Sequence, residues 1–346
     1  MKILHLIHSL GNSGAITFTA DTLLALQERG KVEQFVLCRS NDILLDRLHR
    51  GKIPYELMDF VRWKKWLDQR RIRSKIESYK PDVVHCWMNR AASFMPAESG
   101  VPSLGWFGHY YKVNRFASCD YYTGVSHGLC DYIGRESGYP DRVFLGHTFG
   151  TLPEDTPLSR EEFGIPEDKP VILMLARMHR EKGVDVLLRA CVEVDAFLLL
   201  AGTGPELENY RKLAQDLGIE SCVCFAGWRD DRSALLELAD ILAAPSRNEG
   251  CPTVMPEAWF KGVPVVAARA QGLREYIRHG ENGMLSDIDD VEGLARNLRA
   301  VLEDNALRMR LISEGARTYE TQFSKEVVIS NLLKTYEEII RRGPAL

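Results

Sequence analysis

The chain has little cysteine and no long apolar run, and each absence excludes a class of protein. Its 346 residues include 8 cysteines, which are dispersed, and the closest pair is Cys222-x-Cys224. This spacing gives neither a disulfide framework nor a CxxC metal or redox motif, which indicates a reduced, cytoplasmic protein. No apolar run approaches the ~20 residues that a membrane-spanning helix needs. The first residues turn polar too soon for a signal peptide, so we expect none.

The overall composition indicates a globular protein with two unlike halves. Apolar residues make up 45% and charged residues 27%, and the length suits two domains better than one core. The net charge of −4 argues against a general nucleic-acid binder. Residues 1–157 hold 20 Lys and Arg against 17 Asp and Glu, whereas residues 158–346 hold 24 against 31. Halves of opposite sign suggest two domains with different neighbours.

Short apolar segments alternate with helical ones, which is typical of a parallel sheet covered on both faces. The predicted strands are 2–8, 34–38, 82–86, 103–107, 122–125, 171–175, 196–201, 223–226, 241–244 and 263–267. A Pro-containing polar stretch at 151–157 indicates a linker. We therefore expect an α/β protein with two doubly wound domains, at 1–152 and 153–324. A C-terminal helix within 325–346 should pack back on the body.

Loops after the strands of the second half carry candidate chemistry, because doubly wound sheets bind ligands beyond the carboxyl ends of their strands. After the first such strand, Arg177 and Lys182 precede a helix, an arrangement that suits a diphosphate. A solvated basic loop is the alternative. After the next strand, Gly202 and Gly204 would let the backbone approach a ligand closely. A tight strand-to-helix turn explains them equally well.

A third loop places two glutamates eight residues apart. Glu249 lies in the loop, and Glu257 lies about one turn into the following helix, where a ribose diol could reach it. The amides of Thr253 and Val254, at the expected start of that helix, would face an anion. As generic structure, a glutamate there only complements the helix dipole, at ~0.3–1 kcal/mol.

Together these motifs resemble the C-terminal, nucleotide-binding domain of a glycosyltransferase of the GT-B fold, family 4. The resemblance covers residues 171–285. It is carried by Ala176-Arg177…Lys182-Gly183, Ala201-Gly202-Thr203-Gly204, Phe225-Ala226-Gly227, Pro245-Ser246, the Glu-x7-Glu of Glu249 and Glu257, and Gly272…Glu275…Gly280-Glu281-Asn282-Gly283. It implies two Rossmann-like domains that face a central cleft, and a retaining enzyme that uses a nucleotide-sugar donor.

The resemblance also implies roles for single residues. Arg177 and Lys182 would neutralise the diphosphate leaving group with no metal ion or other cofactor, Glu249 would contact the donor sugar, and Glu257 would hold the ribose. The remaining donor-binding positions would be Gly202, Gly204, Gly227, Trp228, Arg229, Gly250, Cys251, Thr253 and Val254, with the nucleobase near 227–229. The proline that follows Cys251 favours a hexose or N-acetylhexosamine, and uridine is the commonest nucleotide in the family.

The amino-terminal half resembles the family more weakly. Gly14, in the loop 11–14 after the first strand, stands where many members approach the donor phosphate. His109 follows a later strand, where the family often has a catalytic histidine that contacts the donor sugar. A structural or surface histidine is the alternative for His109.

Residues 62–75 hold seven Lys and Arg against one Asp, with Trp63 and Trp66 interleaved. Such a composition suits the headgroup region of an anionic bilayer, where each cation contributes about 1 kcal/mol. The same segment could instead bind a phosphorylated or acidic acceptor glycan. A third interpretation is a solvated helix with both tryptophans partly in the core. No nucleic-acid-binding motif accompanies the segment, so nucleic acid is not an expected partner.

The resemblance thus implies a transferase that builds a cell-surface glycan, glycolipid or lipopolysaccharide, at the inner face of the cytoplasmic membrane if residues 62–75 bind lipid. A sugar-nucleotide epimerase of the same fold would need its own acid and base between the domains. A non-catalytic nucleotide- or glycan-binding relic is the third alternative. A relic has no reason to keep Arg177, Lys182, Glu249 and Glu257 together.

Overall fold

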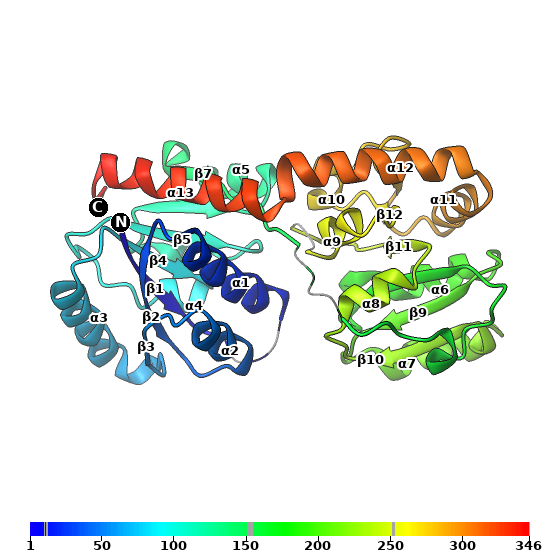
Figure 1. Cartoon of the computed structure of the whole chain (residues 1–346), viewed down its shortest axis with the longest axis horizontal. Coiled ribbons are helices and arrows are strands. Elements are labelled where there is room, and N and C mark those ends of the chain that lie inside the picture. Colours follow the sequence, from blue (N-terminus) through cyan, green and yellow to red (C-terminus); the bar gives the residue numbers. More distant parts are fainter. Residues whose placement is uncertain (10, 12, 151, 153–154, 251–252, 346) are drawn as a thin grey trace. The chain divides into compact units, whose positions relative to one another are not determined.

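The computed structural model describes residues 1–9, 11, 13–150, 152, 155–250 and 253–345. The chain divides into two compact units: residues 1–148 with 325–346, called here the N-terminal unit, and residues 149–324, called the C-terminal unit (Figure 1). Each unit is built on a parallel sheet flanked by helices. The prediction of two doubly wound α/β domains is therefore confirmed.

The N-terminal unit has seven parallel strands in the order β3-β2-β1-β4-β5-β6-β7. They are β1 (Lys2–Ile7), β2 (Glu33–Cys38), β3 (Tyr55–Leu57), β4 (Val83–Trp87), β5 (Ser103–Phe107), β6 (Tyr121–Gly124) and β7 (Val143–Leu145). The helices are α1 (Gly14–Arg29), α2 (Asp42–Arg50), α3 (Lys65–Tyr79), α4 (Met88–Ala92), α5 (His127–Ser137) and α13 (Lys325–Arg342), with 3-10 turns η1 (Arg62–Lys64), η2 (Val113–Phe116) and η3 (Pro140–Arg142). The strand order reverses between β1 and β4, so the topological switch point lies there.

The C-terminal unit has six parallel strands in the order β10-β9-β8-β11-β12-β13. They are β8 (Val171–Leu175), β9 (Phe197–Ala201), β10 (Val223–Gly227), β11 (Ile241–Ala244), β12 (Val265–Ala268) and β13 (Met284–Ser286). The helices are α6 (Val184–Cys191), α7 (Leu207–Asp216), α8 (Arg232–Glu237), α9 (Val254–Phe260), α10 (Gln271–Tyr276), α11 (Val291–Glu303) and α12 (Asn305–Thr318), with single turns η4 (Arg160–Phe163), η5 (Arg180–Lys182), η6 (Glu220–Cys222) and the π-helical η7 (Tyr319–Phe323). The switch point lies between β8 and β11.

The two sheet interiors differ in chemistry. In the C-terminal unit, alternate strand residues such as Leu198 and Leu200 pack with Leu187 and Leu298 of the covering helices in a mainly aliphatic cluster. Aromatic residues such as Trp259 and Phe323 are buried elsewhere in the same unit. The interior of the N-terminal unit differs in that it also carries buried histidine side chains. There, strand pairing sets His5 of β1 opposite His85 of β4.

These histidines tie the last helix to the sheet. Nδ1 of His85 lies 2.6 Å from the hydroxyl oxygen of Tyr336 in α13, and both residues are fully buried. The indole N–H of Trp87 donates to Nδ1 of His5 at 3.1 Å. At the start of α13, Arg29 of α1 pairs with Glu326 at 3.0 Å. The C-terminal helix is thus an integral part of the N-terminal unit.

All ten predicted strands are present, three with the predicted ends and the others with one or both ends shifted by one or two residues. The prediction missed β3, β7 and β13, which have three residues each and lie at the edges of their sheets. Three residues are too few to show a hydrophobic period, so the sequence pattern does not predict such short strands. None of the helices among the described residues combines the length and the hydropathy that a bilayer span requires.

Candidate functional site

The predicted site residues of the C-terminal unit follow the carboxyl ends of neighbouring strands. Arg177 and Lys182 follow β8, Gly202 follows β9, Gly227 ends β10 and Glu249 follows β11. Because β8 and β11 are neighbours at the switch point, the loops after them meet where open α/β sheets bind ligands.

The structure brings Lys182 and Glu249 into direct contact. Nζ of Lys182 donates to Oε2 of Glu249, and Oγ of Ser246 donates to the same oxygen at 3.4 Å. The side chain of Lys182 is 19% exposed and that of Glu249 is 11% exposed, so water screens their attraction little. One ion pair therefore joins the two loops on which the sequence predicted catalytic residues.

Arg177 is held by its backbone, and its side chain is exposed. The amide of His179 donates to the carbonyl of Arg177 at 2.8 Å, and the amide of the buried Met178 donates to Thr203 at 3.0 Å. Within the described part of the chain, the Arg177 guanidinium has no ion-pair partner. It can therefore bind an anionic ligand without first breaking a contact to a described residue.

Arg247, which the sequence reasoning missed, clamps the loop after β11 to the loop after β8. Its guanidinium donates to both carboxylate oxygens of Asp185, at 2.9 and 2.7 Å, and to Asp289 at 2.7 Å. Its amide donates to the carbonyl of Glu181 at 2.8 Å. Burial alone would raise the pKa of Asp185, but the Arg247 guanidinium together with hydrogen bonds from backbone amides lowers it. The two-pronged geometry fixes the loops in register.

Gly202 and Gly204 allow the loop after β9 to pack against the loop that carries Arg177. A Cβ on Gly202 would lie 1.9 Å from the carbonyl oxygen of Ala176, and a Cβ on Gly204 would lie 2.4 Å from that of Met178. No side chain fits at either position. The tight turn therefore accounts for both glycines, and their approach to a donor stays a prediction.

A third glycine, Gly272 at the start of α10, allows that helix to pack against the backbone of the loop that carries Glu249. Its amide donates to the carbonyl of Glu249 at 2.9 Å, and a Cβ there would lie 1.6 Å from the carbonyl oxygen of Gly250. Gly250 itself is buried. The predicted donor-binding residue Cys251 lies outside the described residues.

Helix α9 begins at Val254 with Thr253 at its N-cap, which agrees with the predicted start. Glu257 lies one turn along the helix and is 3% exposed. Its Oε1 accepts a hydrogen bond from the guanidinium of Arg232, which sequence reasoning did not single out. Because an unpaired buried carboxylate is costly, the contact with Arg232 stabilises Glu257 in this position.

The residues predicted near the nucleobase have different environments. Trp228 is 53% exposed, whereas the Arg229 guanidinium is bound to Asp231 and, at 3.1 Å, to Glu162. These carboxylates raise the pKa of Arg229. Arg229 is thus engaged in ion pairs, and the ring face of Trp228 is the more accessible group.

In the N-terminal unit, His109 follows β5 and is half-buried. Its Nδ1 accepts the amide of Tyr110 at 2.8 Å, so the neutral ring carries its proton on Nε2. Gly14 is the first residue of α1, after Ser13 at the N-cap. The first turn of α1 holds no acidic residue, which leaves its positive end suited to an anion.

Asp287 and Asp289 have the spacing of an Asp-x-Asp metal motif, but each carboxylate lies beside the guanidinium of an arginine. Asp289 pairs with Arg247 at 2.7 Å, and Asp287 lies 3.4 Å from Arg269. Among the residues that the structure describes, no three His, Cys, Asp or Glu side chains are grouped to hold a metal ion.

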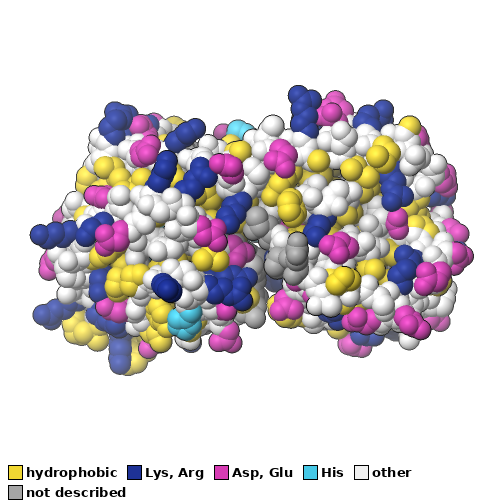
Figure 2. Space-filling view, viewed as in Figure 1, with side chains coloured by type: hydrophobic (Ala, Val, Ile, Leu, Met, Phe, Trp, Pro, Cys, Tyr) yellow, Lys and Arg dark blue, Asp and Glu magenta, His cyan; other side chains and the backbone are white. Residues whose placement is uncertain are grey.

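The segment 62–75 forms η1 and most of α3, and its tryptophans face solvent. Trp63 is 76% and Trp66 is 64% exposed, so the interpretation that places both partly in the core is wrong. At the edge of this unit where Figure 1 draws α3, Figure 2 shows cationic side chains beside apolar ones. The residues of α3 that are buried are Asp68, Ile72 and Ile76.

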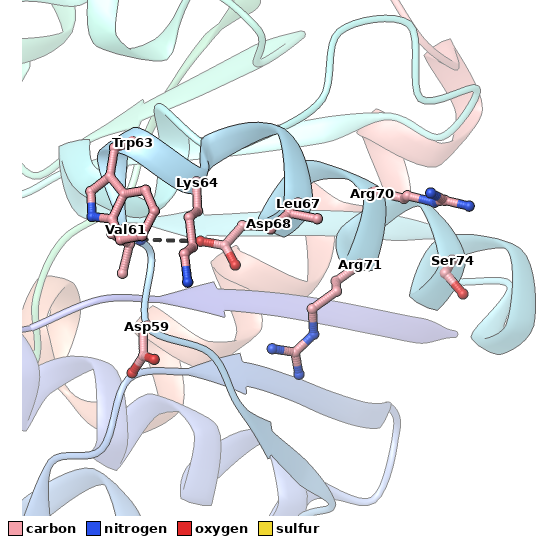
Figure 3. A pocket seen from close by; sticks show the side chains of 9 residues that line it. All are labelled: Asp59, Val61, Trp63, Lys64, Leu67, Asp68, Arg70, Arg71 and Ser74. Carbon is pink, nitrogen blue, oxygen red and sulfur yellow. Dashed lines mark hydrogen bonds between the residues drawn. The ribbon is translucent and has the colours of Figure 1, made fainter.

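A groove of about 520 Å³ runs along this segment. Figure 3 shows Trp63 and Val61 at one end, Arg70 and Ser74 at the other, and Lys64 and Arg71 extending towards the side of Asp59. The carboxylate of Asp68 accepts the amide of Val61 at 3.1 Å, which fixes the turn before the helix. The groove is therefore bordered by three cations and by apolar surface.

Comparisons with known proteins agree with this architecture. Two doubly wound units are the architecture of the GT-B fold. Anabaena Alr3699/HepE, solved in complex with UDP and glucose, has the same fold, with a TM-score of 0.84 at 19% identity over 97% of this chain and 99% of that one.

Sequence relatives identify the family. Residues 155–318 match the model described as "Glycosyl transferases group 1". Two proteins of Rhizobium meliloti (strain 1021), the lipopolysaccharide core biosynthesis glycosyltransferases LpsE and LpsD, are similar along almost the whole chain. LpsE is 30% identical over 96% of this chain and 98% of its own length, and LpsD is 31% identical over 100% and 99%. The chain belongs to the group 1 glycosyl transferases and is a glycosyltransferase.

Proposed function

We propose that this chain is a retaining family 4 glycosyltransferase that moves a hexose or N-acetylhexosamine from a UDP-sugar to a lipopolysaccharide-type acceptor. The names of LpsE and LpsD, which align along nearly all of the chain, support the acceptor class. The UDP and glucose in the HepE complex support the donor class. Glu249 and Glu257 would be the two glutamates of the family motif.

The observation that carries the proposal is the Lys182–Glu249 pair at the β8/β11 switch point, with the exposed Arg177 in the same loop after β8 as Lys182. Glycosyl transfer develops negative charge on the departing phosphate and positive charge at the anomeric carbon. Fixed cations aimed at that phosphate stabilise the transition state, each by about 3 kcal/mol. Lys182 and Arg177 would supply them, and Glu249 would face the donor sugar.

The rest of the site would bind and orient the donor. Glu257, held by Arg232, would accept the ribose hydroxyls, and Trp228 would offer its ring face to the base. In retaining transfer of this kind the departing phosphate takes the acceptor's proton on the same face, so no protein nucleophile is required. Because Arg177 and Lys182 carry the charge that a divalent ion would otherwise supply, we expect turnover without metal.

A thermal-shift screen of UDP, GDP, ADP, TDP and CMP in EDTA tests the donor site. UDP should stabilise the protein, by about 2.7 kcal/mol at 100 times its dissociation constant. Full loss of transfer in EDTA would contradict the metal-free site, and an inverted anomeric configuration in the product would contradict retention. If no nucleotide shifts the melting temperature, the non-catalytic relic becomes the better interpretation.

We further propose that residues 62–75 hold the enzyme on an anionic membrane surface, where a lipid-linked acceptor would lie. Exposed tryptophans prefer the interface of a bilayer, and the flanking cations are attracted to anionic lipid. Changing Lys64, Lys65, Arg70 and Arg71 together to Ser should release the protein from phosphatidylglycerol vesicles. Vesicles of phosphatidylcholine are the control, and equal binding of the variant to anionic vesicles would contradict the proposal.

A further inference from the structure

Four arginines of the N-terminal unit lie in loops that open on one edge of its sheet. Arg39 follows β2, Arg62 begins η1 after β3, Arg90 lies just after α4 begins beyond β4, and Arg115 lies in η2 after β5. The strands β3-β2-β1-β4-β5 are successive neighbours and parallel, so their carboxyl ends meet at the same edge. We call these four residues the arginine cluster. The proposed chemistry on the donor does not use them.

Arg90 lies at the centre of the arginine cluster. Its Nη2 donates to the carbonyl of Phe60 at 2.8 Å, and its guanidinium lies 5.6 Å from the ring centre of Phe94, so the side chain is fixed in place. Burial lowers the pKa of Arg90, and the charges of the other three arginines lower it further. None of the four forms an ion pair with a carboxylate of the described residues. The like charges are therefore gathered without a neutralising partner in that part of the chain.

His8, the residue after β1, experiences the same positive field. It is 6% exposed, and its ring packs edge-on against Phe60 with centroids 5.6 Å apart. Burial lowers the pKa of His8, and Arg90 and Arg39 lower it further, to about 4. The imidazole is therefore neutral near pH 7, and the positive charge at this edge belongs to the arginines.

We propose that the arginine cluster binds an anionic group, a phosphate or a carboxylate, on the sugar that accepts the transferred glycosyl unit. Guanidinium groups bind such groups through two parallel hydrogen bonds, and an anion among four like charges would offset their mutual repulsion. The inference rests on the proposed function, because it names the chemistry of that enzyme's acceptor. Arg62 also begins the segment 62–75, so the arginine cluster adjoins in sequence the surface proposed to meet the membrane.

The diphosphate of the donor is a second source of the same chemistry, so the experiment must separate the two. We would titrate glucose 6-phosphate and galacturonate into the full chain by calorimetry, at low salt and with UDP present at saturation. Glucose is the neutral control. Both charged sugars should bind more tightly than glucose, and added salt should weaken them because exposed charges are screened.

Variants then locate the binding. Arg62→Gln with Arg115→Gln removes two exposed arginines and should weaken the charged sugars by about tenfold or more. Arg135→Gln, an exposed arginine of α5 in the same unit, is the matched control and should change nothing. Unchanged affinity in the double variant, or an equal loss in the control, overturns the proposal.

The UDP measurement separates this proposal from the proposed function. If wild-type protein does not bind UDP, the proposed function fails. If UDP binds but the charged sugars bind no better than glucose, only the assignment of the arginine cluster fails. If glucose 6-phosphate binds only when UDP is absent, the cluster belongs to the donor, and the proposal is again overturned.

Discussion

The two units differ in how they treat charge at the carboxyl edge of their sheets. In the C-terminal unit three of the cations meet carboxylates: Lys182 contacts Glu249, Arg247 contacts Asp185 and Arg232 contacts Glu257. Arg177 has no such ion pair within the described part of the chain. In the N-terminal unit the arginine cluster has no such partners among the described residues. The C-terminal edge is thus a network with its geometry already fixed, whereas the N-terminal edge leaves positive charge for a ligand to neutralise.

The sheet interiors repeat the contrast. The C-terminal unit buries aliphatic and some aromatic side chains, but its two histidines, His179 and His279, are not buried. The N-terminal unit buries His5, His8 and His85, and in each case burial lowers the pKa of the imidazole. The interior of the N-terminal unit therefore contains histidines whose protonation in mild acid disfavours the folded state, and the described interior of the C-terminal unit does not.

The largest expected effect on activity comes from removing Lys182, whose ion pair with Glu249 joins the loops after β8 and β11. Lys182→Met should lower kcat/KM by roughly 100- to 1,000-fold, because a fixed cation that faces the departing phosphate is lost. Lys212→Met, an exposed lysine of α7, is the control and should keep full activity. Steady-state kinetics measures both.

A second variant separates chemistry from stability for this pair. Lys182→Met leaves the carboxylate of Glu249 buried without its partner, which lowers the free energy of unfolding. Adding Glu249→Gln should restore the melting temperature but not the activity. Recovery of activity along with stability would show that the pair is structural only.

A smaller effect is expected at Glu257, because we propose that it binds the ribose of the donor and does not contact the reacting atoms. Glu257→Gln should weaken UDP binding and lower turnover by about tenfold, since one charge-assisted hydrogen bond to the ribose is lost. Calorimetry with UDP measures the change. Unchanged affinity would remove Glu257 from the donor site and leave it as the partner of Arg232.

The smallest expected effect is a loss of stability in mild acid, which tests the contrast between the two interiors. The folded-state pKa is about 3 for His5 and about 4 for His8, below the ordinary 6.5, so the unfolded chain binds more protons between these values. Stability is therefore lost as the pH falls from about 6.5 towards 4.

This loss should be confined to the N-terminal unit. Hydrogen exchange followed peptide by peptide at pH 7, 6 and 5 should show β1 and β4 losing protection before β8 and β11. His8→Gln should reduce the dependence, and His179→Gln, on an exposed loop, should not. Equal loss of protection in both units would contradict the assignment.

The sequence predicts the longer helices and strands, and the motifs whose residues lie close together in the chain. The run Ile3–Leu4 and Leu6–Ile7 is fully buried in β1, and such apolar runs identify a strand covered on both faces. The start of α9 at Val254 and the helix 325–342 follow from local pattern as well. The glutamates of the third loop were singled out by their spacing and by the resemblance, and their roles stay predictions.

The parts that the sequence did not predict depend on residues that only the fold brings together. Arg247 and Asp185 are 62 residues apart, and Arg232 and Glu257 are 25 apart, with no local pattern to pair them. Likewise, composition could not decide whether Trp66 faced solvent, because that depends on which side of α3 packs on the sheet. The arginine cluster is a product of strand order alone.

The return of α13 to the N-terminal unit has a consequence for synthesis in the cell. A ribosome completes residues 149–324 before it makes the segment that covers β4, so the C-terminal unit can fold first although it is encoded second. Until Tyr336 emerges, His85 and the strand that carries it lack their cover. The nascent protein should thus expose an aromatic-rich, unfinished surface until α13 has been made, and this is the stage at which chaperones would find it.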